Sequence, residues 1–260
     1  MAEYDEVKRG ISARFGAAAG NYVSSAVHAQ GDDLPRMVEL ARLEGSERVL
    51  DVATGGGHTA LAFAPHVKEV VASDLTPDML AAAQTFIQSR GVENVRFELA
   101  DAENMPFGDD SFDVVTCRIA AHHFPNPGNF VAEVARVLKP GGRFLLDDNV
   151  APENPELDDF MNRYEKWRDP GHVRAHRVSK WRAMIEGSGM TVEHVEPPGR
   201  KPYPFVEWTS RIGMPEDDRD ELEAWLACAP QEFKDYFEIV VEDGRVISLT
   251  GLYTILVARR

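Results

Sequence analysis

The sequence predicts one α/β domain in which helices cover both faces of a mostly parallel sheet. Short β-branched runs alternate with segments of helical periodicity, which is typical of that architecture. A glycine-rich turn at 55–57 directly follows an apolar run, and open α/β sheets bind their ligands at such turns. Hydrophobic residues make up 43% of the 260 positions, which is enough for a packed core. The whole chain, 1–260, is therefore expected to fold as a single domain.

Seven runs are predicted as strands because each is short, rich in β-branched or other apolar residues, and bounded by turn residues. An eighth run, 237–241, can pair with the last of them across Glu242, Asp243 and Gly244. The seven runs are 47–53, 68–74, 94–99, 112–117, 142–148, 190–196 and 253–258.

Three helices between these strands have clear start or stop signals. Thr76 can cap a helix that has Pro77 at its first position and Gly91 at its end. A second helix is predicted over 127–138, and a third begins at Ser179. The second has one apolar face, made by Phe130, Val131, Val134, Val137 and Leu138.

Two regions lie outside the regular alternation of strands and helices. Residues 1–45 are expected to form a helical amino-terminal cap, and 46–150 the cofactor-binding core. Region 197–236 has four prolines in its first eight positions, before an acidic helix that can start at 215–218. We expect this region to be a lid or substrate insert before the last strand.

Composition and charge argue against several functions. The chain has 28 Lys and Arg residues against 43 Asp and Glu, a net charge of −15, so its field repels nucleic acid and acidic lipid. Cys117 and Cys228 are the only cysteines, and no cysteine and histidine spacing suits zinc, so no metal is expected. The start of the sequence is charged, and no apolar run approaches ~20 residues. We therefore expect a cytoplasmic protein without membrane insertion.

The stretch 49–58 joins a strand to a carboxylate, a tight turn and a helix. It matches Asp-x-Ala-x-Gly-x-Gly over 51–57, which indicates S-adenosylmethionine, and Gly-x-Gly-x-x-Ala over 55–60, which indicates a dinucleotide. Glycine lets the backbone turn tightly and a cofactor lie against it. Asp74 follows the next strand, where it can accept hydrogen bonds from the ribose hydroxyls that both cofactors carry.

Five motifs follow one another between about 45 and 150: Val49–Gly57, Ser73–Asp74, Asp101–Phe107, Ser111–Val115 and Arg136–Gly142. In this order and spacing they resemble the class I S-adenosylmethionine-dependent methyltransferases, particularly the small-molecule branch of the ubiquinone/menaquinone-biosynthesis type. The resemblance implies a Rossmann-like sheet of seven strands in the order 3-2-1-4-5-7-6, with the last strand antiparallel. It also implies methyl transfer from S-adenosylmethionine to a small-molecule acceptor.

The resemblance assigns one group of residues to the adenosine end of the cofactor. It implies that Asp74 binds the ribose and that Leu75 and Met79 lie near the adenine. Asp101 would accept a hydrogen bond from the adenine amino group, while the N–H of Ala102 meets a ring nitrogen.

The methionine end of the cofactor is assigned in the same way. The resemblance places it beside Asp51 and the turn from Gly55 to Gly57. Main-chain groups near Cys117 and Arg118 would hold its amino-acid end. Ala53 stands where the resembled family usually has glycine, and because a methyl group needs little room, we expect adjustment rather than loss of binding.

The dinucleotide interpretation of the turn explains fewer residues. It gives no role to Asp51 or to Asp101 and Ala102, and it places a carboxylate near a pyrophosphate, which is unfavourable. S-adenosylmethionine carries no phosphate, and anions attract its ammonium group. We therefore expect a methyltransferase, with an NAD(P)-dependent oxidoreductase as the alternative and a non-catalytic cofactor-binding interaction module as a second alternative.

His122 and His123 directly follow the fourth strand, at the sheet edge that would face the methyl donor. We expect in-line displacement onto a hydroxyl or carbon nucleophile of an aromatic or lipophilic compound. Either histidine can then act as a base or orient the acceptor. Structural roles, with one histidine hydrogen-bonded in the loop and the other at the surface, explain the pair as well.

Aromatic residues near both ends of the chain are candidates for a substrate site. Phe15 and Tyr22 share a helix face, which suits a lid over the substrate or ordinary core packing. The aromatic residues of region 197–236 can line an apolar substrate pocket or form a small core of their own. They are Tyr203, Phe205, Trp208 and Trp225.

Overall fold

The structure is a computed structural model, and it describes residues 6–13, 15–16 and 31–260. Tyr22 lies outside the described residues. Residues 6–13 and 15–16 are helical.

The strands are β1 (Arg48–Val52), β2 (Glu69–Asp74), β3 (Val95–Leu99), β4 (Phe112–Arg118), β5 (Leu138–Asn149), β6 (Thr191–Val195), β7 (Gly199–Pro204), β8 (Val240–Glu242) and β9 (Arg245–Arg259). The labelled helices are α3 (Asp33–Ala41), α4 (His58–Phe63), α5 (Pro77–Ser89), α6 (Pro127–Val137), α7 (Pro155–Arg168), α8 (Val178–Gly187), α9 (Phe205–Ser210), α10 (Glu216–Ala227) and α11 (Gln231–Tyr236), with short 3-10 helices η1 (Ala64–His66) and η2 (Ala121–His123).

The strands form one sheet whose main path has the order β3-β2-β1-β4-β5-β9-β6. Strands β1 to β5 pair in parallel, and β9 is antiparallel to β5 and to β6. If β9 is counted as strand 7, this order is the predicted 3-2-1-4-5-7-6. The predicted order, with its antiparallel last strand, is therefore confirmed. The sheet has nine strands where the resemblance implies seven, because β9 is 15 residues long and also pairs with β7 and β8.

The central strands send alternate side chains to opposite faces of the sheet. In β1, Val49 belongs to one apolar cluster and Leu50 to the other, and in β4 the same holds for Val114 and Val115. Helices α3, α4 and α5 contribute to the first cluster, and α6 and α8 to the second. The prediction of helices on both faces is therefore confirmed.

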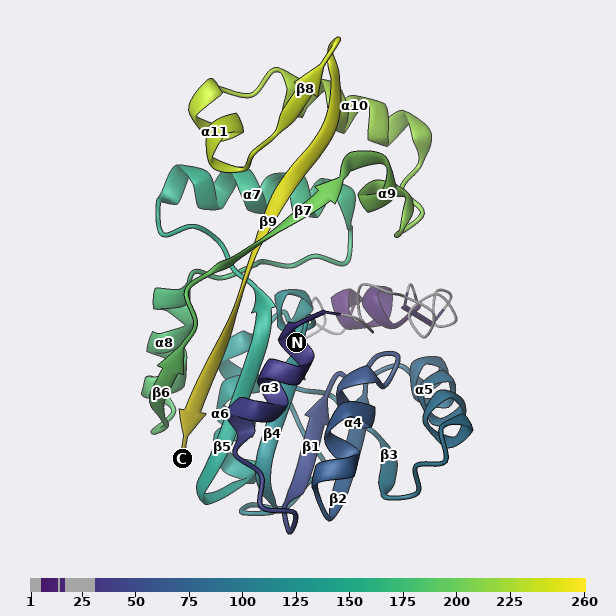
Figure 1. Cartoon of the computed structure of the whole chain (residues 1–260), viewed down its shortest axis with the longest axis vertical. Helices are drawn as coiled ribbons and strands as arrows, with labels where there is room; N and C mark the ends of the chain where they lie inside the picture. Colours follow the sequence, from purple (N-terminus) through teal and green to yellow (C-terminus); the bar gives the residue numbers. More distant parts are fainter. Residues whose placement is uncertain (1–5, 14, 17–30) are drawn as a thin grey trace.

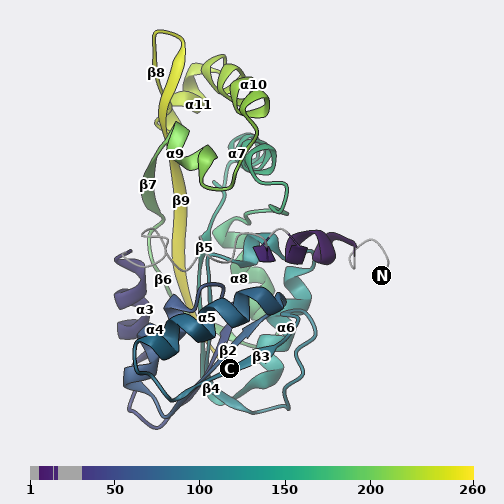
Figure 2. The same ribbon diagram turned by 90° about the vertical axis from the view of Figure 1, so that its right-hand side faces the viewer.

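A group of elements beyond the main path of the sheet forms what we call the helical lobe, made of α7, β7, α9, α10, α11 and β8. These elements gather at one end of the molecule, and β9 runs from there into the sheet (Figures 1 and 2). The helical lobe has its own apolar cluster, which includes Phe160, Tyr164 and Trp208. It is thus built from α7 as well as from most of region 197–236.

Helix α7, over 155–168, is absent from the elements that the sequence predicts. Charged residues crowd this segment and obscure its helical periodicity. Its start signal is nevertheless present, because Pro155 occupies the first turn and the Asn154 side chain accepts hydrogen bonds from the N–H groups of Glu156 and Leu157.

Three local expectations differ from the structure. Thr76 makes no side-chain cap on α5, and its N–H instead donates to Asp74 Oδ1 at 2.9 Å. The proline-rich stretch 199–204 is a strand paired with β9, which is possible because an edge strand tolerates proline. Strand β8 pairs with 245–248 rather than 253–258, because a two-residue turn brings immediately adjacent residues into register.

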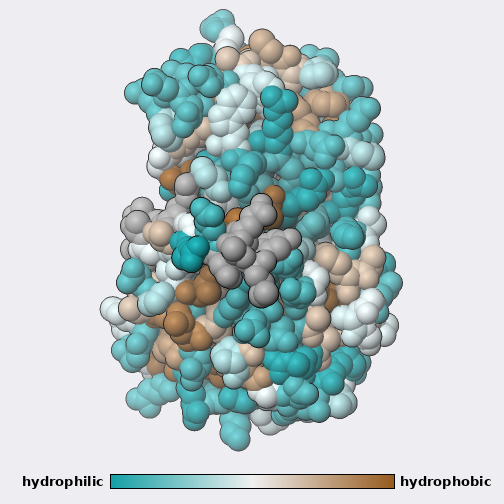
Figure 3. All heavy atoms as spheres, turned by 180° about the vertical axis from the view of Figure 1, so that it is seen from behind, coloured by the Kyte–Doolittle hydropathy of each residue, from teal (hydrophilic) through white to brown (hydrophobic). Residues whose placement is uncertain are grey.

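Hydrophilic residues dominate the face of the molecule seen in Figure 3, as the composition predicts. The longest labelled helix, α7, has 14 residues, whereas about 20 are needed to cross a bilayer. Within the described ranges, no helix combines the length and the apolar content of a membrane span.

Candidate active site

The glycine turn lies between the end of β1 and the start of α4. Three of its residues have a positive φ: Ala53 at 53°, Gly55 at 54° and Gly57 at 83°. Main-chain bonds hold this shape, since the N–H of Thr54 donates to the carbonyl of Ser73 at 2.8 Å and that of Gly57 to the carbonyl of Thr54 at 2.9 Å. The backbone therefore reverses tightly at the carboxyl edge of the sheet.

Ala53 carries a backbone cost in addition to the small room that its methyl group needs. A non-glycine residue in the left-handed region is destabilised by about 1–2 kcal/mol, and Ala53 lies in that region. Glycine, the usual residue of the resembled family, would avoid this cost. The turn therefore holds strain at a position that also contributes to a cavity wall.

Gly57 is required by packing. A Cβ atom on Gly57 would lie 2.9 Å from Ile87 Cδ1 and 3.1 Å from Ala83 Cβ, and both residues belong to α5. A Cβ atom on Gly55 would meet a single atom within 4 Å, Met79 Cε at 3.8 Å. Gly55 thus faces open space, while Gly57 lets α5 approach the turn.

Asp51 supports the turn from behind. Its side chain is buried and accepts hydrogen bonds from Thr54 Oγ1 at 2.6 Å and Thr116 Oγ1 at 2.8 Å. Burial raises the pKa of Asp51 to about 6, although these hydroxyl donors favour its charged form. Asp51 therefore positions the turn, and it does not belong to the cavity wall in front of it.

Asp74 connects the turn with the end of β2. Its Oδ2 accepts the N–H of Gly55 at 3.0 Å, and its Oδ1 accepts the N–H of Thr76 at 2.9 Å. Burial raises the pKa of this carboxyl group. Each oxygen has a further lone pair for a ligand, and Asp74 lies on the cavity wall.

The cavity in front of the turn, which we call the turn cavity, gathers most of the predicted cofactor residues. Gly57 and Cys117 do not belong to its wall, and Cys117 is buried in the core. The predicted residues on the wall are Phe15, Ala53, Gly55, Asp74, Leu75, Met79, Asp101, Ala102, Arg118 and His123.

Lys8 also lines the turn cavity, although no sequence signal predicts it. Its Nζ lies 2.7 Å from Asp101 Oδ2 and 2.8 Å from Glu103 Oε2. The contact arises when the helical segment 6–13 folds over the loop after β3. A local sequence pattern cannot reveal such a long-range pair.

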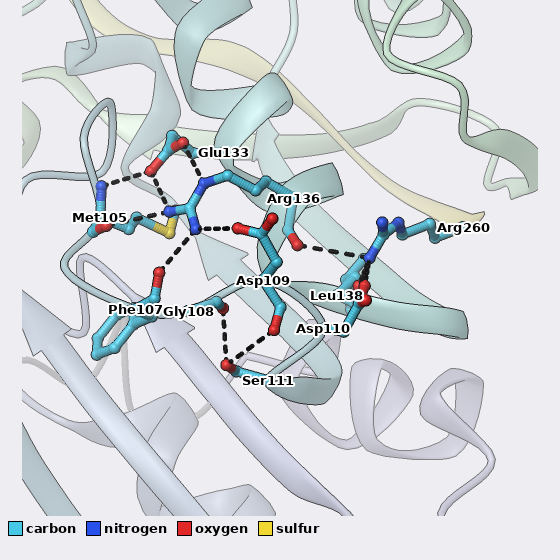
Figure 4. Close-up of polar contacts among 10 residues, drawn as sticks. All are labelled: Met105, Phe107, Gly108, Asp109, Asp110, Ser111, Glu133, Arg136, Leu138 and Arg260. Atoms are coloured by element: carbon cyan, nitrogen blue, oxygen red, sulfur yellow. Dashed lines mark hydrogen bonds and ion pairs between the residues drawn. The ribbon is translucent and has the colours of Figure 1, made fainter.

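Arg136 of α6 holds the loop that carries the 101–107 motif (Figure 4). Its guanidinium donates to the carbonyls of Phe107 at 2.7 Å and Met105 at 3.1 Å. Glu133 accepts from Arg136 at 2.7 Å and from the N–H of Met105 at 2.7 Å. Arg136, which belongs to one sequence motif, therefore fixes the loop that belongs to another.

His122 and His123 lie together after β4, with ring centroids 4.1 Å apart. His122 Nδ1 is 2.6 Å from Asp148 Oδ1. Burial opposes the charged form of His122, but the Asp148 carboxylate outweighs it and raises the pKa. His123 Nδ1 is 2.9 Å from the carbonyl of Gly171, and burial together with the charge of His122 lowers the pKa of His123 to about 4. His123 is therefore neutral near pH 7 and carries its proton on Nδ1, because a carbonyl oxygen can only accept.

A second cavity of about 490 Å³, which we call the lobe cavity, lies between the helical lobe and the sheet edge. Phe15, Ile119 and His123 line both cavities, so the two cavities adjoin at these residues. Ile119 has φ 53°, a left-handed conformation that is rare for a β-branched residue. His122 lines the lobe cavity and not the turn cavity.

The aromatic residues of region 197–236 take both of the roles considered for them. Tyr203 and Trp208 line the lobe cavity, with stacked rings whose centroids lie 6.5 Å apart, and Trp208 also belongs to the apolar cluster of the helical lobe. Phe205 is buried in the apolar cluster of the helical lobe, and Trp225 stacks on Phe160 at 4.7 Å.

A cluster of three charged residues, Arg118, Asp33 and Asp147, joins the walls of the two cavities. Arg118 Nε lies 2.5 Å from Asp33 Oδ2 and 3.5 Å from Asp147 Oδ2. Burial and the neighbouring Asp33 raise the pKa of Asp147 well above its usual range. No sequence signal distinguishes Asp33 and Asp147 from surface acids, because their environment depends on how α3 packs beside β5.

Comparisons with known proteins identify the family. A family model described as a methyltransferase domain matches residues 50–146. The uncharacterized methyltransferase YcgJ of Bacillus subtilis is 43% identical over 235 residues, which cover 90% of this chain and 92% of YcgJ. The ubiquinone/menaquinone biosynthesis C-methyltransferase UbiE of Ectopseudomonas mendocina is 37% identical over 131 residues, about half of each chain.

Solved structures agree with this result. A crystal structure of a candidate methyltransferase from Bacillus halodurans matches with a TM-score of 0.86 at 49% identity, covering 88% of this chain and 99% of that one. The structure of YcgJ matches with a TM-score of 0.85 at 42% identity, covering 87% and 97%. The chain therefore belongs to the class I S-adenosylmethionine-dependent methyltransferases.

Proposed function

We propose that the protein holds S-adenosylmethionine in the turn cavity and methylates a small molecule held in the lobe cavity. One observation carries this proposal: Phe15, Ile119 and His123 line both cavities. A donor in one cavity and an acceptor in the other would therefore meet at these three residues, which is the proximity that a direct transfer requires.

The wall of the turn cavity suits the cofactor. When bound, S-adenosylmethionine supplies an electrophilic methyl group on a sulfonium centre. Asp74 keeps lone pairs for the ribose hydroxyls after accepting two main-chain N–H groups. Gly55 presents bare backbone, while Leu75 and Met79 offer apolar contact for the adenine. The residues present thus fit the adenosyl group.

The lobe cavity suits an aromatic acceptor with a hydroxyl or carbon nucleophile. Its volume of about 490 Å³ lies within the range of small-molecule sites. Tyr203 and Trp208, whose rings stack on each other, contribute aromatic side chains to its wall. UbiE is named as a C-methyltransferase of quinone biosynthesis, and the match covers only about half its length.

His123 is the residue we propose for proton transfer or acceptor orientation. With Nδ1 bonded to the Gly171 carbonyl, its Nε2 carries the free lone pair and can accept a hydrogen bond from an acceptor hydroxyl. The pair formed by His122 and Asp148 lies directly beside it, and the charge of His122 lowers the pKa of His123.

The dependence of kcat/KM on pH tests this role. Because the pKa of His123 is lowered to about 4, its neutral form persists well below the usual histidine range, and we expect no acidic fall in kcat/KM attributable to His123 above about pH 5. In His122→Asn the neighbouring charge is gone, so the acidic limb should move to higher pH. A wild-type limb near 6.5, unchanged in His122→Asn, would contradict the assignment.

Methyl transfer itself is tested with S-adenosylmethionine labelled in the methyl group and a panel of phenols, quinols and aromatic acids. We expect label in one of these compounds and an equal amount of S-adenosylhomocysteine. Asp74→Asn serves as the cofactor-site control and should transfer little label. Binding of S-adenosylmethionine without transfer to any small molecule would instead favour a non-catalytic cofactor-binding module.

A further inference from the structure

Lys201 is a half-buried cation on the wall of the lobe cavity. It lies on β7 two residues before Tyr203, so both side chains leave the same face of the strand. Among the residues that the structure describes, no carboxylate lies within ion-pair distance of its Nζ. Lys201 is therefore a cation that the described carboxylates do not neutralise by direct contact.

Two of the five carboxylates on the same wall are already paired with arginines. Asp33 pairs with Arg118 at 2.5 Å, and Glu165 lies 3.3 Å from Arg168. Burial raises the pKa of Asp147 well above its usual range, which disfavours its charged form. None of these three carboxylates forms an ion pair with Lys201, whose charge can therefore meet a ligand in the cavity.

Other cations surround the aromatic part of this wall. The guanidinium of Arg211 lies 5.5 Å from the ring centroid of Tyr203, and that of Arg168 lies 4.7 Å from that of Trp208. Four cations, Arg168, Arg200, Lys201 and Arg211, share the wall of the lobe cavity with five carboxylates. Burial lowers the pKa of Lys201, because desolvation disfavours the charged form. A bound anion would offset that cost.

We propose that the methyl acceptor carries an anionic group, a carboxylate or a phosphate, which pairs with Lys201 while its aromatic part lies against Tyr203 and Trp208. The proposal rests on the proposed function, because that function assigns the lobe cavity to the acceptor. An ion pair at one end and ring stacking along the wall would fix one orientation of the molecule. A defined orientation is what in-line transfer at His123 requires.

Titration of three small aromatic probes into the protein saturated with S-adenosylhomocysteine tests the proposal. The probes are benzoate, phenyl phosphate and the neutral analogue benzamide, followed by ligand-observed NMR. At least one anion should bind about tenfold or more tightly than benzamide, and the tighter of the two identifies the preferred group. In Lys201→Met this preference should disappear, and in Lys201→Arg it should return.

Lys180→Met is the matched control, because Lys180 is an exposed lysine on α8, and it should keep the wild-type preference. Benzamide binding as tightly as both anions, no binding of either anion up to its solubility limit, or an unchanged preference in Lys201→Met would each overturn the proposal. The titrations require no methyl transfer. If the anions bind through Lys201 but no acceptor is ever methylated, the proposed function fails while the anion site stands.

Discussion

Replacing Gly57 by valine is expected to lower the free energy of unfolding by about 3 kcal/mol or more, which combines left-handed backbone strain with overpacking. Gly57 has φ 83°, a conformation that a β-branched residue strongly disfavours. Its new Cβ would also lie 2.9 Å from Ile87 Cδ1 and 3.1 Å from Ala83 Cβ, and a buried helix cannot move away without disturbing the sheet. Urea denaturation measures the change.

Gly128→Ala is the matched control for this substitution. Gly128 lies in α6 and has no positive φ, and a Cβ atom on it would meet no neighbouring atom within 4 Å. Alanine there should leave the stability unchanged or raise it slightly. Equal stabilities of Gly57→Val and Gly128→Ala would show that α5 does not pack on the turn as described.

Asp74→Ala is expected to weaken binding of S-adenosylmethionine at least about 100-fold, the effect of losing two hydrogen bonds to a charged acceptor. The substitution removes the proposed partner of the ribose hydroxyls. It also frees the N–H groups of Gly55 and Thr76, which Asp74 accepts, so the turn itself should loosen. Isothermal titration calorimetry measures the affinity.

Glu98→Ala provides the comparison for this loss, because Glu98 is an exposed carboxylate on the neighbouring strand β3 and should bind as the wild type does. Asp74→Asn keeps one acceptor oxygen and the size of the side chain, so it separates loss of binding from loss of folding. Wild-type affinity in a folded Asp74→Asn protein, together with wild-type affinity in Asp74→Ala, would remove Asp74 from the site.

The fold of the core can be predicted from sequence because its signals are local. Alternating strands and helices, the turn at 55–57 and the apolar face of α6 each depend on residues within one or two turns of chain. Side chains such as Val49 and Leu50 then pack on opposite faces because a strand alternates them. Local pattern and tertiary packing agree here.

The helical lobe is harder to predict because it depends on contacts distant in sequence. Strand β7 forms only by pairing with β9, from Gly199 opposite Tyr253 to Pro204 opposite Ser248. Helix α7 carries many charges, and its buried face can be recognised only from its packing against α10 and the neighbouring aromatic residues. The same packing determines that Tyr203 and Trp208 line the lobe cavity while Phe205 and Trp225 do not.

The candidate site likewise combines residues that local motifs identify with residues that only contacts distant in sequence bring in. The motifs point to Gly55, Asp74 and Asp101, which meet at one cavity. Lys8 and Lys201 occur in no motif, because both reach the site only through contacts with residues that are distant in sequence. Lys8, for example, pairs with Asp101, which is 93 positions away. The strain at Ala53 depends on the sign of a backbone angle, which composition does not reveal.

A crystal structure of the protein with S-adenosylhomocysteine would show directly whether the two cavities form one active site. We expect the adenosyl group to lie among Gly55, Asp74 and Asp101, with the sulfur directed past Ile119 and His123 toward the lobe cavity. A sulfur that points away from the lobe cavity, or an adenosyl group bound elsewhere, would contradict a single active site built from both cavities.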